Sequence, residues 1–297
     1  MSQPANIDAP RMVWMYEPNL PLAIIASIIY GVSFIYIFYL TMIRYRAWYF
    51  SCVVAGSWLE VLGYVTRCIS IKQPTQTVLF AVTLSFVVLA PIFVAAGNYL
   101  LIGRLVQRVL PARHQRVFGV HGRLITRVFV GLDIISFFVQ SSGSIVAIVV
   151  NWQGPRAQTG LNVLVAGLAL QVAGFCFFLA VFARFHWLAT SHAAPHAPAG
   201  WKQVVAAVYI SSFLILIRSI YRVAEFAEGV MGYSFNHEWL FWVFDAVPMV
   251  VAISVFCVYH PSTCLGSDGR MERVEEDGDQ KELGSFGTRS TVAPEQR

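Results

Sequence analysis

Seven ionisable side chains lie inside stretches of this chain that are otherwise apolar. Arg218, Arg222 and Glu225 follow one another at spacings of four and three residues, and Asp245 lies in the next apolar stretch. In a helix these spacings place side chains on one face, so the first three form a single charged stripe. An ionisable group at the centre of a bilayer costs about 2.5 to 3.5 kcal/mol, so such groups normally face the protein interior and pair. The pattern predicts ion pairs between helices.

A further acid and a further arginine occur earlier in the chain. Glu60 and Arg67 are seven residues apart, which is two helical turns along one face, and Tyr64 lies between them. A rise of about 1.5 Å per residue places five charged groups at matched depth in the outer half of the membrane. These groups are Glu60, Arg218, Arg222, Glu225 and Asp245. Matched depth on three helices permits one shared network.

A polar stripe runs along another apolar stretch. Asp133, Ser136, Gln140 and Gly143 have offsets of three, seven and ten residues, which place all four on one helical face. Gln171 lies near the middle of the following stretch. Together with the charged groups, these residues are predicted to line a polar path through most of the bilayer. The alternative is that the amides only hold helices together, since such hydrogen bonds stabilise membrane bundles.

The elements that must position these residues are seven long apolar runs. The runs are 20–43, 47–66, 77–102, 125–150, 160–182, 204–227 and 238–259. Each is long enough to cross a bilayer about 30 Å thick as a helix, and none alternates with a period of two as a barrel strand does. Only 12% of the residues are charged, compared with about 25% in soluble domains. The predicted fold is all-α, a polytopic membrane protein with a seven-transmembrane-helix bundle.

The basic residues predict how this bundle is oriented. Arginine and lysine concentrate in the first, third and fifth connections between the runs, which the positive-inside rule places in the cytosol. We therefore expect an extracellular N-terminal segment at 1–19, the seven-helix domain at 20–261 and a disordered acidic cytosolic tail at 262–297. The net charge of +5 is then a topology signal, and no nucleic-acid partner is expected.

Several kinds of chemistry lack their usual residues in this sequence. No Gly-x-x-x-x-Gly-Lys-Ser/Thr loop for ATP occurs, and the seven histidines are not clustered as a zinc site requires, so no cofactor or metal is expected. A seven-helix receptor or sensor has the same orientation and is an alternative, although the Asp/Glu-Arg-Tyr triplet of such receptors is missing. An integral-membrane lipid-modifying enzyme with paired carboxylates is a third possibility. Of these classes, we do not expect an enzyme.

At these polar positions the sequence resembles the fungal RTA-like lipid-translocating exporters. This seven-helix family includes the sphingoid long-chain-base exporter and aminocholesterol-resistance proteins. The resemblance covers the second to seventh runs, with the motifs in order and at family-like intervals. The matching segments are Glu60-x-x-Gly63-Tyr64-x-x-Arg67, Ala90-Pro91 with Gly103-Arg104, Asp133-x-x-Ser136-x-x-x-Gln140-x-x-Gly143, Gly167 with Gln171, Arg218-Ser219-x-x-Arg222-x-x-Glu225, His237-Glu238 with Asp245, and His260-Pro261.

The resemblance implies residence in the plasma membrane, or in an endomembrane, and a link to stress and drug resistance. It implies movement of, or protection against, amphipathic lipids such as sphingoid bases and phospholipids, or lipid-like toxic compounds. Protein partners are not predicted. As a hypothesis for mechanism, a cationic amphiphile presents its ammonium group to Glu60, Asp133 or Asp245 while its tail stays in lipid. Arg218 or Arg222 then holds the carboxylates when no substrate is bound.

Overall fold

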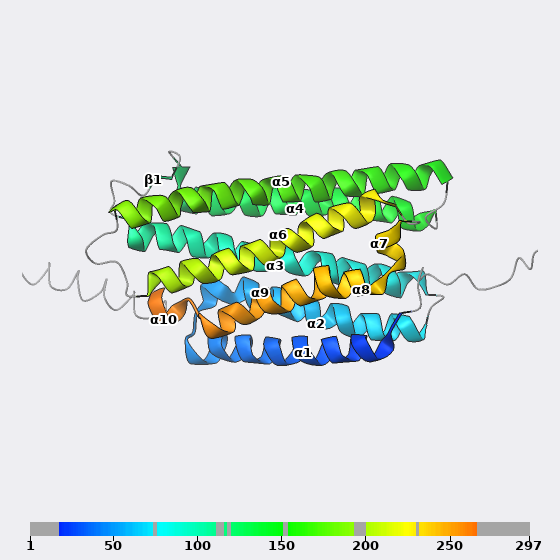
Figure 1. The fold of residues 1–297 in the computed structure, drawn as a ribbon, viewed down its shortest axis with the longest axis horizontal. Coiled ribbons are helices and arrows are strands. Elements are labelled where there is room, and N and C mark those ends of the chain that lie inside the picture. The colour runs from blue at the N-terminus through cyan, green and yellow to red at the C-terminus, as the bar shows by residue number, and fades with distance from the viewer. Residues whose placement is uncertain are drawn as a thin grey trace, which may run out of the picture.

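The computed structural model describes residues 18–73, 76–110, 116–117, 120–150, 154–192, 200–229 and 232–265. Within these residues, seven helical stretches are long and apolar enough to cross a membrane. They run back and forth along one bundle axis (Figure 1). The predicted all-α, seven-helix fold is confirmed, and the chain is an integral membrane protein. The assignment of the N-terminus to the outer side stays a prediction. Residues 262–265, expected to belong to a disordered tail, are helical instead, and the rest of that expected tail, from 266 onward, lies outside the described residues.

The spans are built from long helices with local irregularities in the first, second and last. The first five are α1 (Leu20–Phe38) with η1 (Tyr39–Arg44), η2 (Trp48–Phe50) with α2 (Ser51–Lys72), α3 (Thr77–Val109), α4 (Gly122–Val149) and α5 (Gly154–His192). The last two are α6 (Trp201–Ala227) and the run of α8 (Glu238–Phe241), η4 (Trp242–Ala246) and α9 (Val247–Val258). Short helices α7 (Tyr233–Asn236) and α10 (Ser262–Leu265) flank the last span. A hairpin of β1 (Arg116–Val117) and β2 (Val120–His121) lies between α3 and α4.

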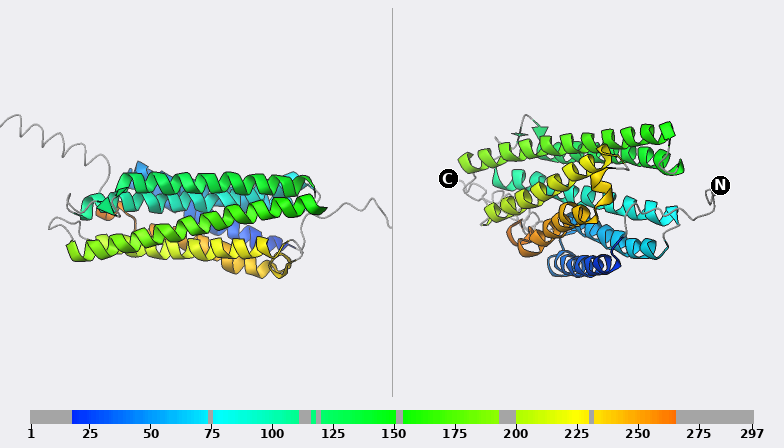
Figure 2. Two further views of the ribbon diagram at one scale, coloured as in Figure 1. Left: turned by 90° about the horizontal axis from the view of Figure 1, so that it is seen from above. Right: turned by 45° about the vertical axis from the view of Figure 1, so that its right-hand side comes forward.

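The helices that carry the charged residues lie in the middle of the bundle. Figure 1 shows α5 and α4 along one edge, α1 along the opposite edge, and α2, α3, α6 and α9 between them. The right-hand view of Figure 2 shows the same order. At its edge, α1 exposes Ile28, Val32 and Ile35 by 60 to 66%. Such apolar surface suits lipid tails, which are as apolar as the side chains themselves.

Three helices are longer than the apolar runs predict. The prediction 47–66 stops short of Lys72, the prediction 77–102 stops short of Val109, and the prediction 160–182 is short at both ends of α5. The helix α5 ends at His192, beyond the predicted end at 182. A helix needs only its own backbone hydrogen bonds and residues such as Arg, Gln and Ala that favour it. These helices therefore continue beyond the apolar run, where hydropathy gives no signal.

Glycines let two pairs of helices touch along their backbones. A Cβ atom at Gly143 would lie 2.5 Å from Leu164 N, and one at Gly160 would lie 2.8 Å from the Gly143 carbonyl oxygen. Between α2 and α3, a Cβ atom at Gly56 would lie 2.9 Å from the Ala90 carbonyl oxygen. Small residues allow this approach in membranes, where packing replaces the hydrophobic driving force between helices. The bundle thus contains two closely joined pairs, α2 with α3 and α4 with α5.

His260 closes one end of the bundle beyond the last span. Its Nδ1 accepts a hydrogen bond from the Ser262 backbone N–H at 3.3 Å, which leaves the ring proton on Nε2, 3.2 Å from Thr41 Oγ1. The ring also stacks on Tyr45, with centroids 4.9 Å apart. Burial lowers the pKa of His260 from 6.5 to about 4. The folded protein therefore holds this ring neutral.

Replacing Gly143 with alanine should destabilise the contact between α4 and α5, because the new methyl group meets backbone atoms that cannot rotate away. Overpacking of this kind costs about 1 to 3 kcal/mol. The matched control is Gly131→Ala on the same helix, where a Cβ atom would have no neighbour within 4 Å. The measurement is the thermal midpoint of the purified variants in detergent. Equal midpoints for the two variants would contradict the close packing.

The stability of the bundle should fall as the pH is lowered below 6.5. Above that pH the His260 ring is neutral in both the folded and the unfolded chain, so its contribution is fully present. Between pH 6.5 and about 4 the unfolded chain binds a proton that the folded chain does not, and stability is lost, by roughly 3 kcal/mol at most. Thermal midpoints measured across this range should show a flatter profile for His260→Asn. An equally steep profile for His260→Asn would contradict this role of the ring.

Candidate functional site

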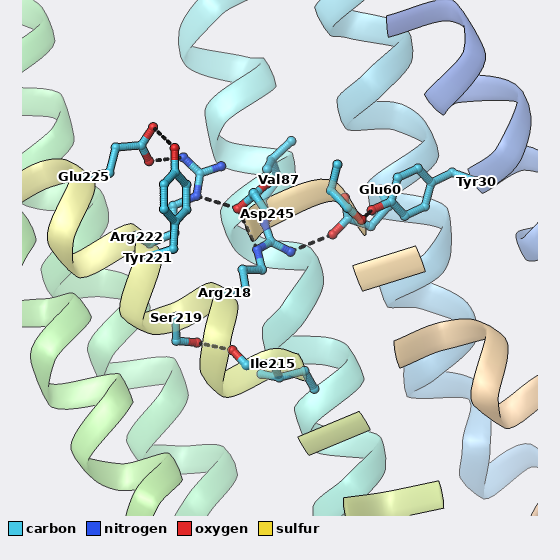
Figure 3. A network of polar contacts seen from close by, with 11 residues as sticks. Tyr30, Glu60, Val87, Ile215, Arg218, Ser219, Tyr221, Arg222, Glu225 and Asp245 are labelled. Carbon is cyan, nitrogen blue, oxygen red and sulfur yellow. Dashed lines mark hydrogen bonds and ion pairs between the residues drawn. The ribbon is translucent and has the colours of Figure 1, made fainter. Parts of the chain in front are cut away.

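Five buried charged side chains from three spans meet inside the bundle. They are Glu60 of α2, Arg218, Arg222 and Glu225 of α6, and Asp245 of η4, and together we call them the charge cluster. Each of these residues is only 1 to 6% exposed. The structure therefore brings together the five groups that matched depth had placed in one network. Their side chains point to one another rather than into lipid (Figure 3).

Arg218 connects α6 to three other helical segments. Its Nη1 donates to Glu60 Oε1 at 2.8 Å, and its Nε donates to Asp245 Oδ1 at 2.9 Å. Its Nη2 donates to the Val87 carbonyl oxygen of α3. That carbonyl is free because Pro91, four residues later in the same helix, has no N–H to donate to it. A single guanidinium thus joins α6 to α2, α3 and η4.

Arg222 extends the ion pairs by one turn of α6. Its Nε donates to Asp245 Oδ1 at 2.8 Å, and its Nη1 donates to Glu225 Oε2 at 2.9 Å. The Tyr221 hydroxyl donates to the other oxygen of Glu225 at 3.3 Å. Figure 3 shows the resulting alternation of acid and base, which runs Glu60, Arg218, Asp245, Arg222, Glu225. In a buried site each of these bonds is stronger than in water, and an unpaired member is costly.

A widened helical turn positions Asp245. This residue belongs to the π-helical turn η4, which ends directly before α9 and its second residue, Pro248. A proline ring clashes with the carbonyl group four residues earlier in an α-helix, and the extra residue of a π-turn changes that spacing. Tyr30 of α1 donates from its hydroxyl to the Ala246 carbonyl oxygen at 2.7 Å and so supports the turn. Turns of this kind are frequent at functional sites.

The charge cluster contains more negative than positive groups. Three carboxylates face two guanidiniums, so the five groups sum to one negative charge when all are ionised. Three buried atoms have no hydrogen-bond partner among the described residues: Glu60 Oε2, Asp245 Oδ2 and Arg222 Nη2. These atoms can therefore bind a proton, a water molecule or a ligand. Within the same part of the chain, no group of three or more His, Cys, Asp or Glu is arranged to hold a metal ion.

Tyr64 lies beside the charge cluster rather than inside it. Its ring stacks on Tyr30, with centroids 4.7 Å apart, and on Trp242, with centroids 5.9 Å apart. These rings form an aromatic wall between α1, α2 and η4. Tyr30 was not predicted from the sequence, because the same apolar run also contains Tyr36 and Tyr39 and the signal was weak.

Arg67 forms a further ion pair, outside the charge cluster. Its Nη2 lies 3.0 Å from Glu238 Oε1, and its guanidinium carbon lies 4.3 Å from the centroid of the Phe241 ring. The other oxygen of Glu238 accepts the Asn19 backbone N–H at 2.9 Å. This pair therefore joins α2 to the beginnings of the first and last spans.

The polar stripe of α4 makes two contacts that are separate from the charge cluster. Asp133 accepts a hydrogen bond from the Tyr99 hydroxyl of α3 at 2.8 Å, and Gln140 donates to Gln171 Oε1 of α5 at 2.8 Å. Aromatic rings surround Tyr99, including Phe178 at a centroid distance of 4.5 Å. No hydrogen bond between described residues links these two pairs to the charge cluster. The stripe and the charge cluster are therefore separate hydrogen-bonded groups, and the polar path through the bilayer stays a prediction.

Replacing Asp245 with alanine should destabilise the bundle, because both arginines lose the carboxylate oxygen that they share. Breaking a buried ion pair from one side costs about 3 to 5 kcal/mol. Asp245→Asn keeps an oxygen in the same place without its charge, so it should lie between the alanine variant and the wild type. The measurement is the unfolding midpoint of the three proteins in detergent micelles. An alanine variant as stable as the wild type would show that the ion pairs do not hold the spans together.

Known proteins resemble most of this chain. The family described as RTA1 like protein matches residues 53–268, which include the whole charge cluster. Protein RTM1 of Saccharomyces cerevisiae is 32% identical over 71% of this chain and 65% of its own length. Protoporphyrin uptake protein 1 of the same yeast is 34% identical over 68% of this chain and 65% of its own length. Sphingoid long-chain base transporter RSB1, also from that yeast, is 26% identical over 82% of this chain and 72% of its own length.

These matches extend over several spans rather than one short motif. The first two relatives are matched over just under two thirds of their own length. No solved structure is significantly similar to the chain. Because the family match covers well over half of the sequence, with the motifs around Glu60, Asp133 and Arg218 inside it, the chain belongs to the RTA1-like protein family.

Proposed function

We propose that this protein moves amphipathic lipids or lipid-like compounds across the membrane that contains it, and thereby protects the cell from them. Two relatives support the proposal by name, one as a sphingoid long-chain base transporter and one as a protoporphyrin uptake protein. Both named compounds combine an apolar body with ionisable groups. In this proposal the protein acts in the plasma membrane and leaves its substrate chemically unchanged.

The surplus negative charge of the charge cluster is the observation on which the proposal rests. A cationic amphiphile brings one positive charge and several hydrogen-bond donors, which suit the unpartnered Glu60 Oε2 and Asp245 Oδ2. When the ammonium group binds, the cluster reaches a net charge of zero. The apolar tail stays in lipid, so only the head has to enter the bundle.

A change of ion-pair partners within the charge cluster allows the head group to enter without leaving a buried charge unpaired. If the ammonium group takes Glu60, Arg218 keeps Asp245 and the Val87 carbonyl oxygen as partners. The head can then pass toward Asp245, which both arginines hold by a single oxygen. An uncompensated buried charge would cost several kcal/mol, roughly 3 to 5, and this arrangement avoids it at each step.

A proton can neutralise the same surplus charge. Protons and cationic substrates therefore compete for the carboxylates of the charge cluster, and a pH gradient can drive the exchange. This source of energy is consistent with a sequence that has no ATP-binding loop.

Glu60→Gln and Asp133→Asn should each lower the flux of a sphingoid base about tenfold or more, which corresponds to about 1.4 kcal/mol of lost interaction. Each variant keeps the shape of the side chain and removes the charge that holds the ammonium group. The measurement is the flux of fluorescent sphingoid base in vesicles containing the purified protein, with and without a pH gradient. Protoporphyrin and a labelled phospholipid, tested in the same vesicles, identify the preferred substrate.

The matched control is Glu228→Gln, because this carboxylate is exposed between α6 and α7 and lies outside the charge cluster. Its flux should equal that of the wild type. Unchanged flux in both Glu60→Gln and Asp133→Asn would remove the mechanism, and failure of these variants to fold would assign the residues a structural role. Wild-type vesicles that move none of the three compounds faster than empty vesicles would overturn the proposed function.

A further inference from the structure

A groove on the side of the bundle lies between the two closely joined helix pairs. It has a volume of about 140 Å³, comparable to cavities that hold one benzene ring. Its mouth includes Ser85 of α3 and Ile145 of α4, which are both exposed. Its floor includes Gln140, Leu168 and Phe226, which are all buried. We call this cavity the lateral groove.

A smaller cavity lies between the floor of the lateral groove and the charge cluster. It has a volume of about 20 Å³, which is enough for one group the size of a water molecule. Val88 and Leu168 line both cavities, so they form a common wall. The far side of the smaller cavity is formed by Arg218, Arg222 and Gln171. The side chains of Val88 and Leu168 therefore separate the two arginines at the centre of the bundle from the lateral groove.

Two buried polar atoms along this route have no hydrogen-bond partner in the described part of the chain. Gln140 Oε1 belongs to a side chain that lines the lateral groove, and Arg222 Nη2 belongs to one that lines the smaller cavity. The two residues are 3% and 5% exposed. A buried polar atom left unpaired costs about 1 to 3 kcal/mol. The Gln140 oxygen needs a hydrogen-bond donor, and the Arg222 nitrogen needs an acceptor. A hydroxyl group or another small polar head can supply both a donor and an acceptor.

The surroundings of the mouth are apolar. On the same stretch of α4, Phe138 and Ile145 are 67% and 60% exposed, and a side chain exposed there faces lipid tails. Because the backbone contacts lie within each helix pair, the boundary between α3 and α4 can widen without separating the glycine contacts at Gly56 or Gly143. Access to the charge cluster along this boundary is therefore from the lipid, not from the water at either end of the bundle.

We infer that the lateral groove is the access route of a single-chain amphiphile, whose chain lies between α3 and α4 and whose hydroxyl-bearing head reaches Arg222 and Gln140. This inference rests on the proposed function and specifies its substrate class. The smaller cavity is too small for a phosphocholine or a porphyrin ring. The quaternary ammonium of a phosphocholine also has no N–H to donate to the carboxylates of the charge cluster. A hydroxyl group fits the smaller cavity and can accept a hydrogen bond from Arg222 or donate one to Gln140, while an amine beside it is a donor for the carboxylates.

Ser144→Trp fills the lateral groove from α4 and tests the inference. The matched control is Ser142→Trp, two residues away on the exposed face of the same helix. Both purified proteins are placed in lipid nanodiscs, and binding of tritiated sphinganine is measured together with its flux in vesicles. Ser144→Trp should weaken binding and slow flux at least tenfold, whereas Ser142→Trp should match the wild type.

A competition experiment tests the lateral route if Ser144→Trp fails to fold. Unlabelled sphinganine should displace the tritiated compound from the wild-type protein, and an alkyl phosphocholine of the same chain length should not. Equal displacement by both compounds, or normal binding and flux in a folded Ser144→Trp, would overturn the lateral route while leaving the proposed function in place. A wild-type protein that neither binds nor moves sphinganine would instead overturn the proposed function.

Discussion

The rest of the site depends on one carboxylate oxygen that is shared by two arginines. Arg218 and Arg222 lie one turn apart on α6, and like charges at that spacing destabilise a helix. Asp245 Oδ1 accepts a hydrogen bond from both of them, at 2.9 and 2.8 Å. Because Asp245 belongs to another span, this bridge between the two arginines forms only when the last span packs against α6. The two arginines of α6 thus favour packing of the last span against that helix, because the last span carries the carboxylate that they share.

Two prolines provide the backbone chemistry that this arrangement uses. Pro91 leaves the Val87 carbonyl without its helical donor, and Arg218 supplies the missing hydrogen bond. Pro248 follows the widened turn that contains Asp245. In lipid a freed backbone group has no water to bind, so a proline is tolerated where a neighbouring side chain can replace the lost partner. The irregular backbone and the buried charges therefore stabilise one another, and each would be costly alone.

Part of this site was predictable from spacing, and part was not. The offsets between Arg218, Arg222 and Glu225 fix a common face on any helix, and counting residues from the span ends placed Glu60 and Asp245 at the same depth. The pairing of Arg67 with Glu238 was not predictable, because it depends on how closely two helix ends approach. Helix ends were underestimated since a helix continues in polar sequence without a hydropathy signal. The π-turn, like the choice of Tyr99 as the partner of Asp133, follows from packing that no single segment encodes.

The close glycine contacts within each helix pair and the surplus negative charge of the charge cluster act together. Arg218 and Arg222 belong to the charge cluster and also line the smaller cavity beside the lateral groove. A cation that binds Glu60 or Asp245 weakens the hold of these carboxylates on the arginines, and so changes the lining of that cavity. A ligand can shift a conformational equilibrium only by binding one state better than the other. Here the preferred state is the one in which an added positive charge replaces an arginine as the partner of a carboxylate. The helix pairs need not deform for this to happen, since the exchange takes place among side chains of α2, α6 and η4.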